Sequence, residues 1–380
     1  MNFVKEYMQE IGFESVYSFY GLTKCLEKRF GLEKGREVDK TLPLLKRRSR
    51  EFYDYKNSDP YIAKLVSEAF DFDNVQVICN WIVKNEEFFG NTILEVGCDW
   101  GFFSCFLAKL FPESKITAID CCSNAVRNAR ALAKQAGVCN VEFVECDLRD
   151  LKGTYNTVFS CRTIKENYDR NIRDSIDFSL KDLPEQAESY RDSLRPYCKA
   201  LRRNLAEHGK LICFEDIGRG SLLLGWIEAM LEQGLVLDLD KYSEVAVRKD
   251  IGETVFHAFV ATRGKITDID PLNLYHSANS KYVDYSSAKH TGWDAKIVFD
   301  RKKGVRIKGY SIENKEYDER ERYEVWTNRE DEKTLLSYYK NSNEISILSI
   351  YDISNEPEMY RAIQDALDVA VTIGGIVQEY

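Results

Sequence analysis

The spacing of hydrophobic residues divides the chain into three stretches of different character. Up to about Phe89, apolar side chains recur every three or four residues, for example in residues 61–66 and 75–83, and this spacing predicts helices. Ser58-Asp59-Pro60 predicts a helix start, because Pro fits the first turn and a preceding Ser or Asp can cap free amides. Residues 1–89 are therefore expected to form an N-terminal helical extension.

From Asn91 onward, short apolar runs alternate with helical segments. Strands are predicted at Thr92–Val96, Lys115–Ile119, Val141–Val144, Thr157–Ser160 and Lys210–Phe214. Helices are predicted between them at Phe103–Phe111, Ser123–Ala136 and Asp192–Glu207, then at Leu222–Gln233, with late strands at Leu235–Leu239, Val245–Val247 and Thr254–Thr262. This alternation is typical of a parallel sheet with crossover helices. It predicts a doubly wound α/β domain over residues 90–264.

Residues 265–380 have a third pattern, in which polar loops separate shorter segments. Alternating segments occur at Ala295–Phe299, Val305–Tyr310 and Arg322–Thr327, and Ile345–Tyr351 resembles a buried strand. Asp331–Tyr339 and Glu358–Ala370 are expected to be helical. We expect a small α+β C-terminal domain, which shapes a substrate pocket or mediates homo-oligomer formation.

Composition narrows the classes of protein that fit this pattern. With 380 residues, 44% of them hydrophobic, the chain can bury more than one core. A net charge of −9 weakens any interpretation as a general nucleic-acid binder. The basic group Lys46, Arg47, Arg48 and Arg50 is either a solvated face or a set of substrate contacts. Neither a signal peptide nor a membrane-spanning run is visible, so we expect a cytoplasmic protein.

Cysteine and histidine give little support for a metal site. The eleven cysteines contain no C-x-x-C pair, and the four histidines lie far apart. We expect reduced thiols and no structural metal. His257 falls in a late strand and is expected in the core or on the hairpin surface.

The segment from Ile93 to Gly101 is the most informative for chemistry. An apolar strand ends there in Glu95 and is followed by Gly97 and Gly101, whose missing Cβ atoms allow a sharp turn and the close approach of a ligand. The next strand ends in Asp120, an acid placed to accept hydrogen bonds from ribose hydroxyls. The pyrophosphate pattern G-x-G-x-x-G fails at Asp99 and Phe102, which disfavours a dinucleotide.

These residues resemble the first motif of the class I S-adenosylmethionine-dependent methyltransferases, acid-x-Gly-x-Gly-x-Gly, with Asp99 in place of the middle glycine. The resemblance covers about residues 91–263. It includes Asp120, Cys146-Asp147 after the third strand, and residues 201–212 as the family's helix, turn and fifth strand. It implies a Rossmann-like methyltransferase fold and S-adenosylmethionine as cofactor, with S-adenosylhomocysteine as product.

The resemblance also implies a set of cofactor contacts. Asp120 is assigned to ribose and Asp147 to the adenine amino group, with helix or loop capping as the alternative for each. Glu95 either caps and orders the turn or reaches the cofactor ammonium through water, and Asp99 either stabilises the turn or obstructs cofactor binding. The expected cofactor-binding residues are Glu95, Gly97, Cys98, Asp99, Gly101, Asp120, Cys121, Asp147, Leu148, Cys161 and Tyr53.

Methyl transfer from an activated donor needs mainly an aligned nucleophile and exclusion of water. A general base would follow the fourth or fifth strand, and Glu166 and Glu215 are the candidate catalytic residues, with solvated or capping acids as the alternative. Arg162, Asn167 and Asp216 occupy similar positions. Tyr53 and Tyr55 could instead cover the methionine end of the cofactor.

Three functions fit these observations. The first is a methyltransferase for a small molecule. The second keeps the reaction but makes the acceptor a protein or RNA; no Asn-Pro-Pro-Tyr or Pro-Cys motif is present to support its familiar forms. The third is a non-catalytic, methyltransferase-like scaffold, suggested by Asp99.

Overall fold

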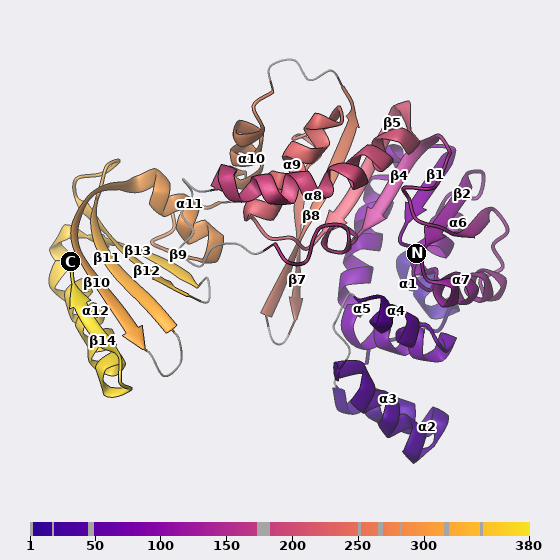
Figure 1. The fold of residues 1–380 in the computed structure, drawn as a ribbon, viewed down its shortest axis with the longest axis horizontal. Coiled ribbons are helices and arrows are strands. Elements are labelled where there is room, and N and C mark those ends of the chain that lie inside the picture. The colour runs from indigo at the N-terminus through magenta and orange to yellow at the C-terminus, as the bar shows by residue number, and fades with distance from the viewer. Residues whose placement is uncertain are drawn as a thin grey trace. The chain divides into compact units, whose positions relative to one another are not determined.

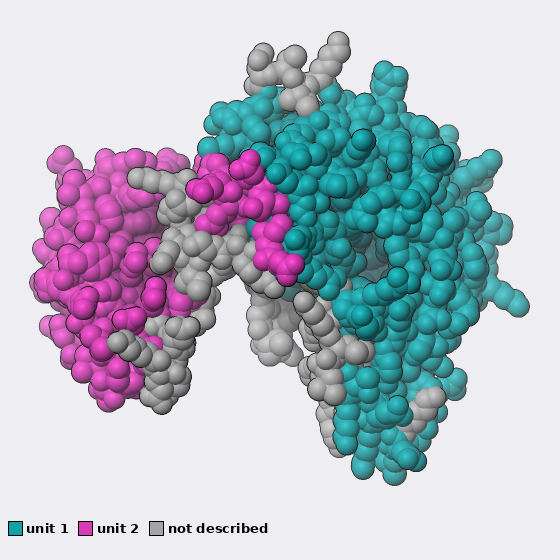
Figure 2. Space-filling view, in the orientation of Figure 1, with its two compact units in different colours: residues 1–170, 190–218, 225–274 teal, residues 171–189, 219–224, 275–380 magenta. Residues whose placement is uncertain are grey.

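The computed structural model describes residues 3–16, 19–44, 49–172, 183–249, 252–264, 269–281, 283–314, 319–342 and 345–380. The chain forms two compact units, shown in different colours in Figure 2. Unit 1 comprises residues 1–170, 190–218 and 225–274, and unit 2 comprises residues 171–189, 219–224 and 275–380. Of the basic group noted above, residues 46–48 lie outside the described residues.

The N-terminal part of unit 1 is helical, as its hydrophobic spacing predicts. Its helices are α1 (Phe3–Glu10), α2 (Phe19–Phe30), α3 (Leu32–Leu44), α4 (Arg50–Lys56) and α5 (Pro60–Lys84), followed by the short helix η1 (Glu86–Phe88). The predicted start of α5 is confirmed, because the Asp59 side chain accepts a hydrogen bond from the Tyr61 amide at 2.8 Å. Leu22, Leu26 and Val38 pack against the first turns of α5.

The centre of unit 1 is a mainly parallel sheet. Its strands are β1 (Thr92–Val96), β2 (Lys115–Asp120), β3 (Val141–Glu145), β4 (Tyr155–Cys161), β5 (Leu205–Glu215), β6 (Leu235–Leu237), β7 (Ser243–Lys249) and β8 (Gly252–Arg263). They lie in the order β3-β2-β1-β4-β5-β8-β6, and β7 pairs with β8. The first five strands are parallel, whereas β8 runs antiparallel to β5. The predicted doubly wound α/β fold is confirmed.

Helices cover this sheet (Figure 1). The connecting helices are α6 (Phe102–Leu110), α7 (Ser123–Gln135), α8 (Leu183–Asn204) and α9 (Ser221–Glu232). One core cluster joins α1, α5, α6 and α7 to alternate sheet residues, among them Ile93 and Phe159. Their neighbours Leu94 and Val158 are also fully buried, as expected for strands covered on both faces.

The strand order reverses between β1 and β4, and this reversal locates the site. Ligands of open α/β sheets bind beyond the carboxyl ends of the strands at such a point. The loops after β1, β2, β3 and β4 therefore carry the candidate residues.

The helix predicted at Asp192–Glu207 has other boundaries in the structure, where α8 begins at Leu183 and ends at Asn204. The helix predicted to continue to Glu207 ends at Asn204, and Leu205 already pairs with Tyr155 of β4. Ladder pairing with β4 prevails over the helical propensity of Leu205 and Ala206.

Unit 2 contains an antiparallel sheet, ordered β14-β10-β11-β12-β13-β9. Its elements are α10 (Pro271–Ser280, which begins in unit 1), β9 (Lys289–Thr291), α11 (Gly292–Lys302), β10 (Lys303–Asn314), β11 (Glu319–Asn328), β12 (Thr334–Asn341), β13 (Ser346–Asp352), η3 (Ile353–Asn355), α12 (Glu356–Thr372) and β14 (Ile376–Glu379). One core cluster joins α11 to the sheet and a second joins α12 to it.

Two predictions for this part of the chain are wrong. Ala295–Phe299 belongs to helix α11 rather than to a strand, because Ala295, Val298 and Phe299 form the helix face that packs on the sheet. Most of 331–339, predicted helical, forms strand β12. Its adjacent residues Leu335 and Leu336 enter different core clusters, so the strand is covered on both faces and shows no alternation.

Within the described ranges, no helix is both long enough and apolar enough to cross a membrane.

Candidate functional site

The loop after β1 is shaped by three residues with positive φ. Gly97 has a φ of 76°, Asp99 of 47° and Gly101 of 91°. A Cβ on Gly101 would lie 2.7 Å from the Cβ of Ala129, so glycine is what allows α6 to approach α7. A Cβ on Gly97 would lie 3.0 Å from Thr163 Cγ2, on the other wall of the same opening.

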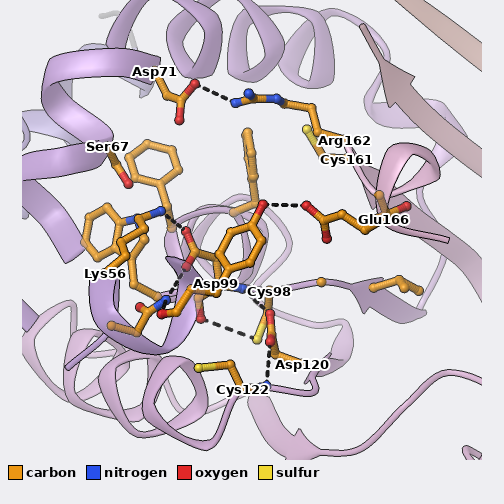
Figure 3. A pocket seen from close by; sticks show the side chains of 18 of the residues that line it. Lys56, Ser67, Asp71, Cys98, Asp99, Asp120, Cys122, Cys161, Arg162 and Glu166 are labelled. Carbon is orange, nitrogen blue, oxygen red and sulfur yellow. Dashed lines mark hydrogen bonds and ion pairs between the residues drawn. The ribbon is translucent and has the colours of Figure 1, made fainter. Parts of the chain in front are cut away.

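Asp99 occupies its glycine position without leaving its charge uncompensated. Asp is among the residues that tolerate the left-handed conformation best. Lys56 Nζ lies 2.5 Å from Asp99 Oδ2, and Asn57 Nδ2 donates to Oδ1 at 2.9 Å. Lys56 is only 5% exposed, and the Asn57 carbonyl accepts a 2.9 Å hydrogen bond from Asn128 of α7. Asp99, which stands where the motif has glycine, therefore links α4 to the loop after β1 (Figure 3).

Asp120 lies at the end of β2, beside this loop. Its Oδ2 accepts a hydrogen bond from the Asp99 amide at 2.8 Å and its Oδ1 one from the Cys122 amide at 2.9 Å. Each carboxylate oxygen keeps a lone pair for a further donor. Burial, together with the Asp99 charge, raises the pKa of Asp120 to about 6, while the hydrogen bond from the Cys122 amide opposes the shift.

The loop after β3 brings Asp147 and Leu148 to the same opening. Asp147 accepts the Arg149 amide at 2.7 Å and forms an ion pair with the Arg149 side chain at 3.0 Å. The Cys121 thiol lies 3.9 Å from Asp147 Oδ2. Leu148 is buried and lines the cavity. The predicted adenine residue therefore has a loop-ordering role in the structure as well.

Glu95 points away from the opening. It is 2% exposed and accepts a hydrogen bond from Ser104 in α6. Burial raises its pKa to about 8, opposed by the bond from Ser104. Glu95 does not line the cavity, so its geometry matches the turn-ordering alternative.

The end of β4 supplies charged groups to the opposite wall. Cys161 lines the cavity, and Arg162 follows it with a φ of 60°. Arg162 Nη1 donates to Asp71 Oδ1 of α5 at 2.5 Å. In the next turn, η2 (Ile164–Glu166), Glu166 accepts a hydrogen bond from the Tyr53 hydroxyl of α4. Burial, together with the Glu166 charge, raises the pKa of Tyr53 far above its usual value, so the hydroxyl stays protonated.

Glu215 is not brought into the cavity, unlike its neighbour Asp216. It is fully buried and accepts hydrogen bonds from the amides of Thr163 at 3.0 Å and Ile164 at 3.3 Å. Burial raises the pKa of Glu215 to about 8, while these two hydrogen bonds oppose the shift. Glu215 thus orders the loop that presents Arg162 and Glu166.

A cavity of about 780 Å³ unites these loops within unit 1. Of the predicted residues, Tyr53, Gly97, Cys98, Asp99, Asp120, Cys121, Asp147, Leu148, Cys161 and Glu166 line it. Four other predicted residues do not line it: Glu95, Gly101, Glu215 and Tyr55. His257 is 1% exposed and bonded to the Tyr242 hydroxyl at 2.6 Å, so it lies in the core as expected.

Several residues that line the cavity were not predicted from the sequence. They come from the N-terminal helices and include Lys56, Asn57, Ser67, Phe70, Asp71 and Asn74. The unusual charge at Asp99 was a signal that a basic partner was needed, but no spacing rule locates a partner more than forty residues away.

Comparison with known proteins agrees with this geometry. Residues 93–177 match the sequence model of a methyltransferase domain family. Over 96 residues the chain is 26% identical to the ribosomal RNA small subunit methyltransferase C of Buchnera aphidicola subsp. Baizongia pistaciae (strain Bp). That match covers 24% of the chain and spans only 29% of the length of the relative.

Two solved structures are among those similar to part of the chain. The N-methyltransferase NodS of Bradyrhizobium japonicum WM9, in complex with S-adenosylhomocysteine, is 12% identical and has a TM-score of 0.40, covering 56% of this chain and 97% of NodS. The magnesium protoporphyrin IX methyltransferase of Synechocystis PCC 6803, with bound S-adenosylmethionine, is 16% identical with a TM-score of 0.37, covering 57% and 98%.

The sheet order, the glycine loop and the family match together define a methyltransferase domain. The central part of this chain is similar to the class I S-adenosylmethionine-dependent methyltransferases, and residues 93–177 match a methyltransferase domain. The cofactor of that superfamily is S-adenosylmethionine.

The charges that line the cavity fit this cofactor. Among the described residues, six acidic and four basic side chains line it. An acidic excess suits a ligand that carries a sulfonium and an ammonium better than a pyrophosphate. The positive φ of Gly97 and the Thr163 methyl group beside it leave a backbone opening that a Cβ would fill. No group of three or more His, Cys, Asp or Glu residues that could hold a metal ion occurs in the described part of the chain.

Proposed function

We propose that the chain is an S-adenosylmethionine-dependent methyltransferase that acts on a small-molecule acceptor. The observation that carries this proposal is the 780 Å³ cavity, which is lined on one side by the motif loops and on the other by α4 and α5. This volume lies in the range of pockets that enclose small ligands.

In this proposal the cofactor lies along the carboxyl ends of β1 to β4. Asp120 accepts hydrogen bonds from the ribose hydroxyls, and Asp147 with Leu148 contacts the adenine. Gly97, Cys161 and Tyr53, which line the cavity, would hold the methionine end. The bound cofactor supplies a methyl group on a sulfonium, which is already activated for transfer.

The residues of the chain then orient the acceptor and manage its proton. The Glu166 carboxylate lines the cavity and is held by the Tyr53 hydroxyl. We assign Glu166 as the group that takes a proton from the acceptor's nucleophilic atom. Glu215 serves as a positioning residue, because its hydrogen bonds hold the Thr163 and Ile164 amides in place.

Isothermal titration with S-adenosylmethionine and S-adenosylhomocysteine tests the cofactor assignment. Wild type is expected to bind both, and Asp120→Ala to weaken binding at least about ten-fold, because two charge-assisted hydrogen bonds are lost. A folded wild-type protein that binds neither compound would overturn the proposal and favour the scaffold hypothesis. Methyl transfer to members of a metabolite panel would then define the acceptor.

An RNA or protein acceptor is the second candidate, and the similarity to a ribosomal RNA methyltransferase favours it. The net charge of −9 opposes it, because phosphate backbones are repelled at long range. Radiolabel that enters macromolecules of a cell lysate, rather than small metabolites, would select this candidate.

The remaining assignments extend the same proposal. We place the protein in the cytoplasm and divide it at residues 89 and 264 into a helical lid, the methyltransferase domain and a C-terminal domain. The C-terminal domain shapes the substrate pocket or joins copies of the chain.

A further inference from the structure

Arg162 has an unusual backbone at the acceptor side of the cavity. Its φ of 60° makes it, with Asp99, one of two non-glycine residues with positive φ in the described ranges. The Phe214 carbonyl accepts its amide hydrogen at 2.8 Å, which fixes this conformation. Unfavourable backbone geometry of this kind gathers at functional sites, where it aims a side chain.

Hydrogen bonding around Arg162 is incomplete. Arg162 Nη1 donates to Asp71 Oδ1 at 2.5 Å, and Asn74 Nδ2 donates to the same oxygen at 3.2 Å. Arg162 Nε and Asn74 Oδ1 are buried and have no hydrogen-bond partner in the described structure. Since buried polar atoms are nearly always bonded, this cluster has one donor and one acceptor left for a ligand.

Two acids on this side are paired with other side chains by a hydrogen bond or an ion pair. Glu166 is bonded by Tyr53, and Asp216 lies 3.5 Å from Lys165 Nζ. Burial opposes the charge of Arg162, but Asp71 and Asp216 outweigh it and raise its pKa, so the guanidinium stays charged. Because Nη1 is engaged by Asp71, the edge formed by Nε and Nη2 remains, and this edge matches the two oxygens of a carboxylate.

The other lining residues from α5 and α6 are mainly apolar and partly aromatic. Phe70, Val75 and Ile78 of α5 line the cavity, together with Phe103 of α6. Such a wall favours a compact ring over an extended polar chain.

We propose that the methyl acceptor is a small aromatic carboxylate, whose carboxylate binds the Nε–Nη2 edge of Arg162. A hydrogen-bond donor next to this carboxylate faces Asn74 Oδ1. Asp71 positions Arg162 for the contact. This inference rests on the proposed function, because it names the acceptor of that cavity.

Titration with three ring compounds of matched size tests it. Benzoate carries the carboxylate, benzamide replaces it with a neutral group, and benzylamine reverses the charge. Each is titrated into wild type with and without saturating S-adenosylhomocysteine. Benzoate is expected to bind at least about ten-fold more tightly than either of the others, as a desolvated, charge-assisted pair requires. Preference for benzylamine, equal binding, or no binding of any compound would overturn the proposal.

Variants locate the effect. Arg162→Lys keeps a charge for Asp71 but lacks the two-donor edge, and Arg162→Gln removes the charge. Both are expected to lose the preference for benzoate by about ten-fold. Arg195→Gln, which breaks an exposed ion pair to Glu232 on α9, should keep it.

The cofactor carries a carboxylate of its own, and one comparison separates the two sources. If Arg162 serves the acceptor, S-adenosylhomocysteine binds Arg162→Lys about as tightly as wild type. Equal losses for S-adenosylhomocysteine and benzoate would assign the guanidinium to the cofactor and overturn the proposal. If the proposed function is wrong, S-adenosylhomocysteine does not bind wild type. The binding of benzoate alone would still test whether Arg162 holds a carboxylate.

Discussion

Gly101 and Gly137 both have positive φ, but only Gly101 packs closely against another residue. Alanine substitutions at the two positions therefore distinguish the energetic cost of backbone conformation from that of a steric clash. Gly101 has a φ of 91° and faces Ala129, whereas Gly137 has a φ of 65° and has no atom within 4 Å of an added Cβ. Gly137→Ala is expected to lower the free energy of unfolding by about 1 kcal/mol, and Gly101→Ala by about 3 kcal/mol, since it adds a clash to the conformational cost. Urea unfolding of both variants measures the difference. Equal losses would show that α6 and α7 are not in close contact at Gly101.

The buried carboxyl of Glu95 makes stability depend on pH. Burial raises its pKa from about 4.5 to about 8, so between these values the unfolded chain has released a proton that the folded chain retains. Raising the pH through this window therefore lowers stability. Glu95→Gln removes this contribution, and its stability relative to wild type is expected to rise by about 1–3 kcal/mol between pH 5 and 8.

Chemical denaturation at several pH values checks this prediction. Glu142→Gln, an exposed substitution on the neighbouring part of the sheet, is the control and should follow the wild-type profile. A constant difference between Glu95→Gln and wild type across the window would contradict the prediction.

Sequence alone identified the residues at the strand ends but not the direction of every side chain. Asp120, Asp147 and Glu166 lie at the cavity because they follow parallel strands that end at one edge. Glu215 and Asp216 are adjacent at such an end, and only Asp216 lines the cavity. Neighbours in a strand point to opposite faces, and which face opens to the cavity depends on the loop packed against it.

Helix α4 contributes residues to the wall of the cavity. Lys56, which is buried, forms an ion pair with the partly exposed Asp99 between α4 and the loop after β1. Asp99→Asn keeps the side-chain shape and the tolerance for positive φ but removes the ion-pair partner of the buried Lys56. We expect a loss of about 2 kcal/mol in the free energy of unfolding.

A second substitution shows whether the charge is responsible. Lys56→Met combined with Asp99→Asn removes both charges and should restore most of the loss, measured by a double-mutant cycle. Glu232→Gln breaks an exposed pair with Arg195 and is expected to cost less than about 1 kcal/mol. A double variant as unstable as Asp99→Asn would contradict the role of charge.

The parallel strands of unit 1 followed the sequence more closely than two elements of unit 2. The five parallel strands were found because their apolar runs are short and lie between helical segments. β12 was mistaken for a helix, because Leu335 and Leu336 are buried on opposite faces of its sheet and leave no alternation. Ala295–Phe299 was mistaken for a strand, because Ile and Val favour strands unless packing overrides them.

At the scale of the molecule, cofactor binding is expected to belong to unit 1 alone. Among the described residues, those that line the cavity all lie in this unit. A chain of residues 1–274 is therefore expected to bind S-adenosylhomocysteine with an affinity within about three-fold of the full chain. Titration of both proteins, with circular dichroism to verify folding, measures this. Loss of binding in a folded shortened chain would show that the C-terminal residues complete the site.

The pairing of Lys56 with Asp99 also has an evolutionary consequence. A buried lysine without a counter-charge is costly. An acid in the glycine loop without a lysine would leave an uncompensated negative charge beside the cofactor site. Substitution at one position therefore changes what is acceptable at the other. Descendants of the same ancestor should carry lysine with aspartate at these two positions, or an uncharged residue with glycine, and seldom the mixed combinations.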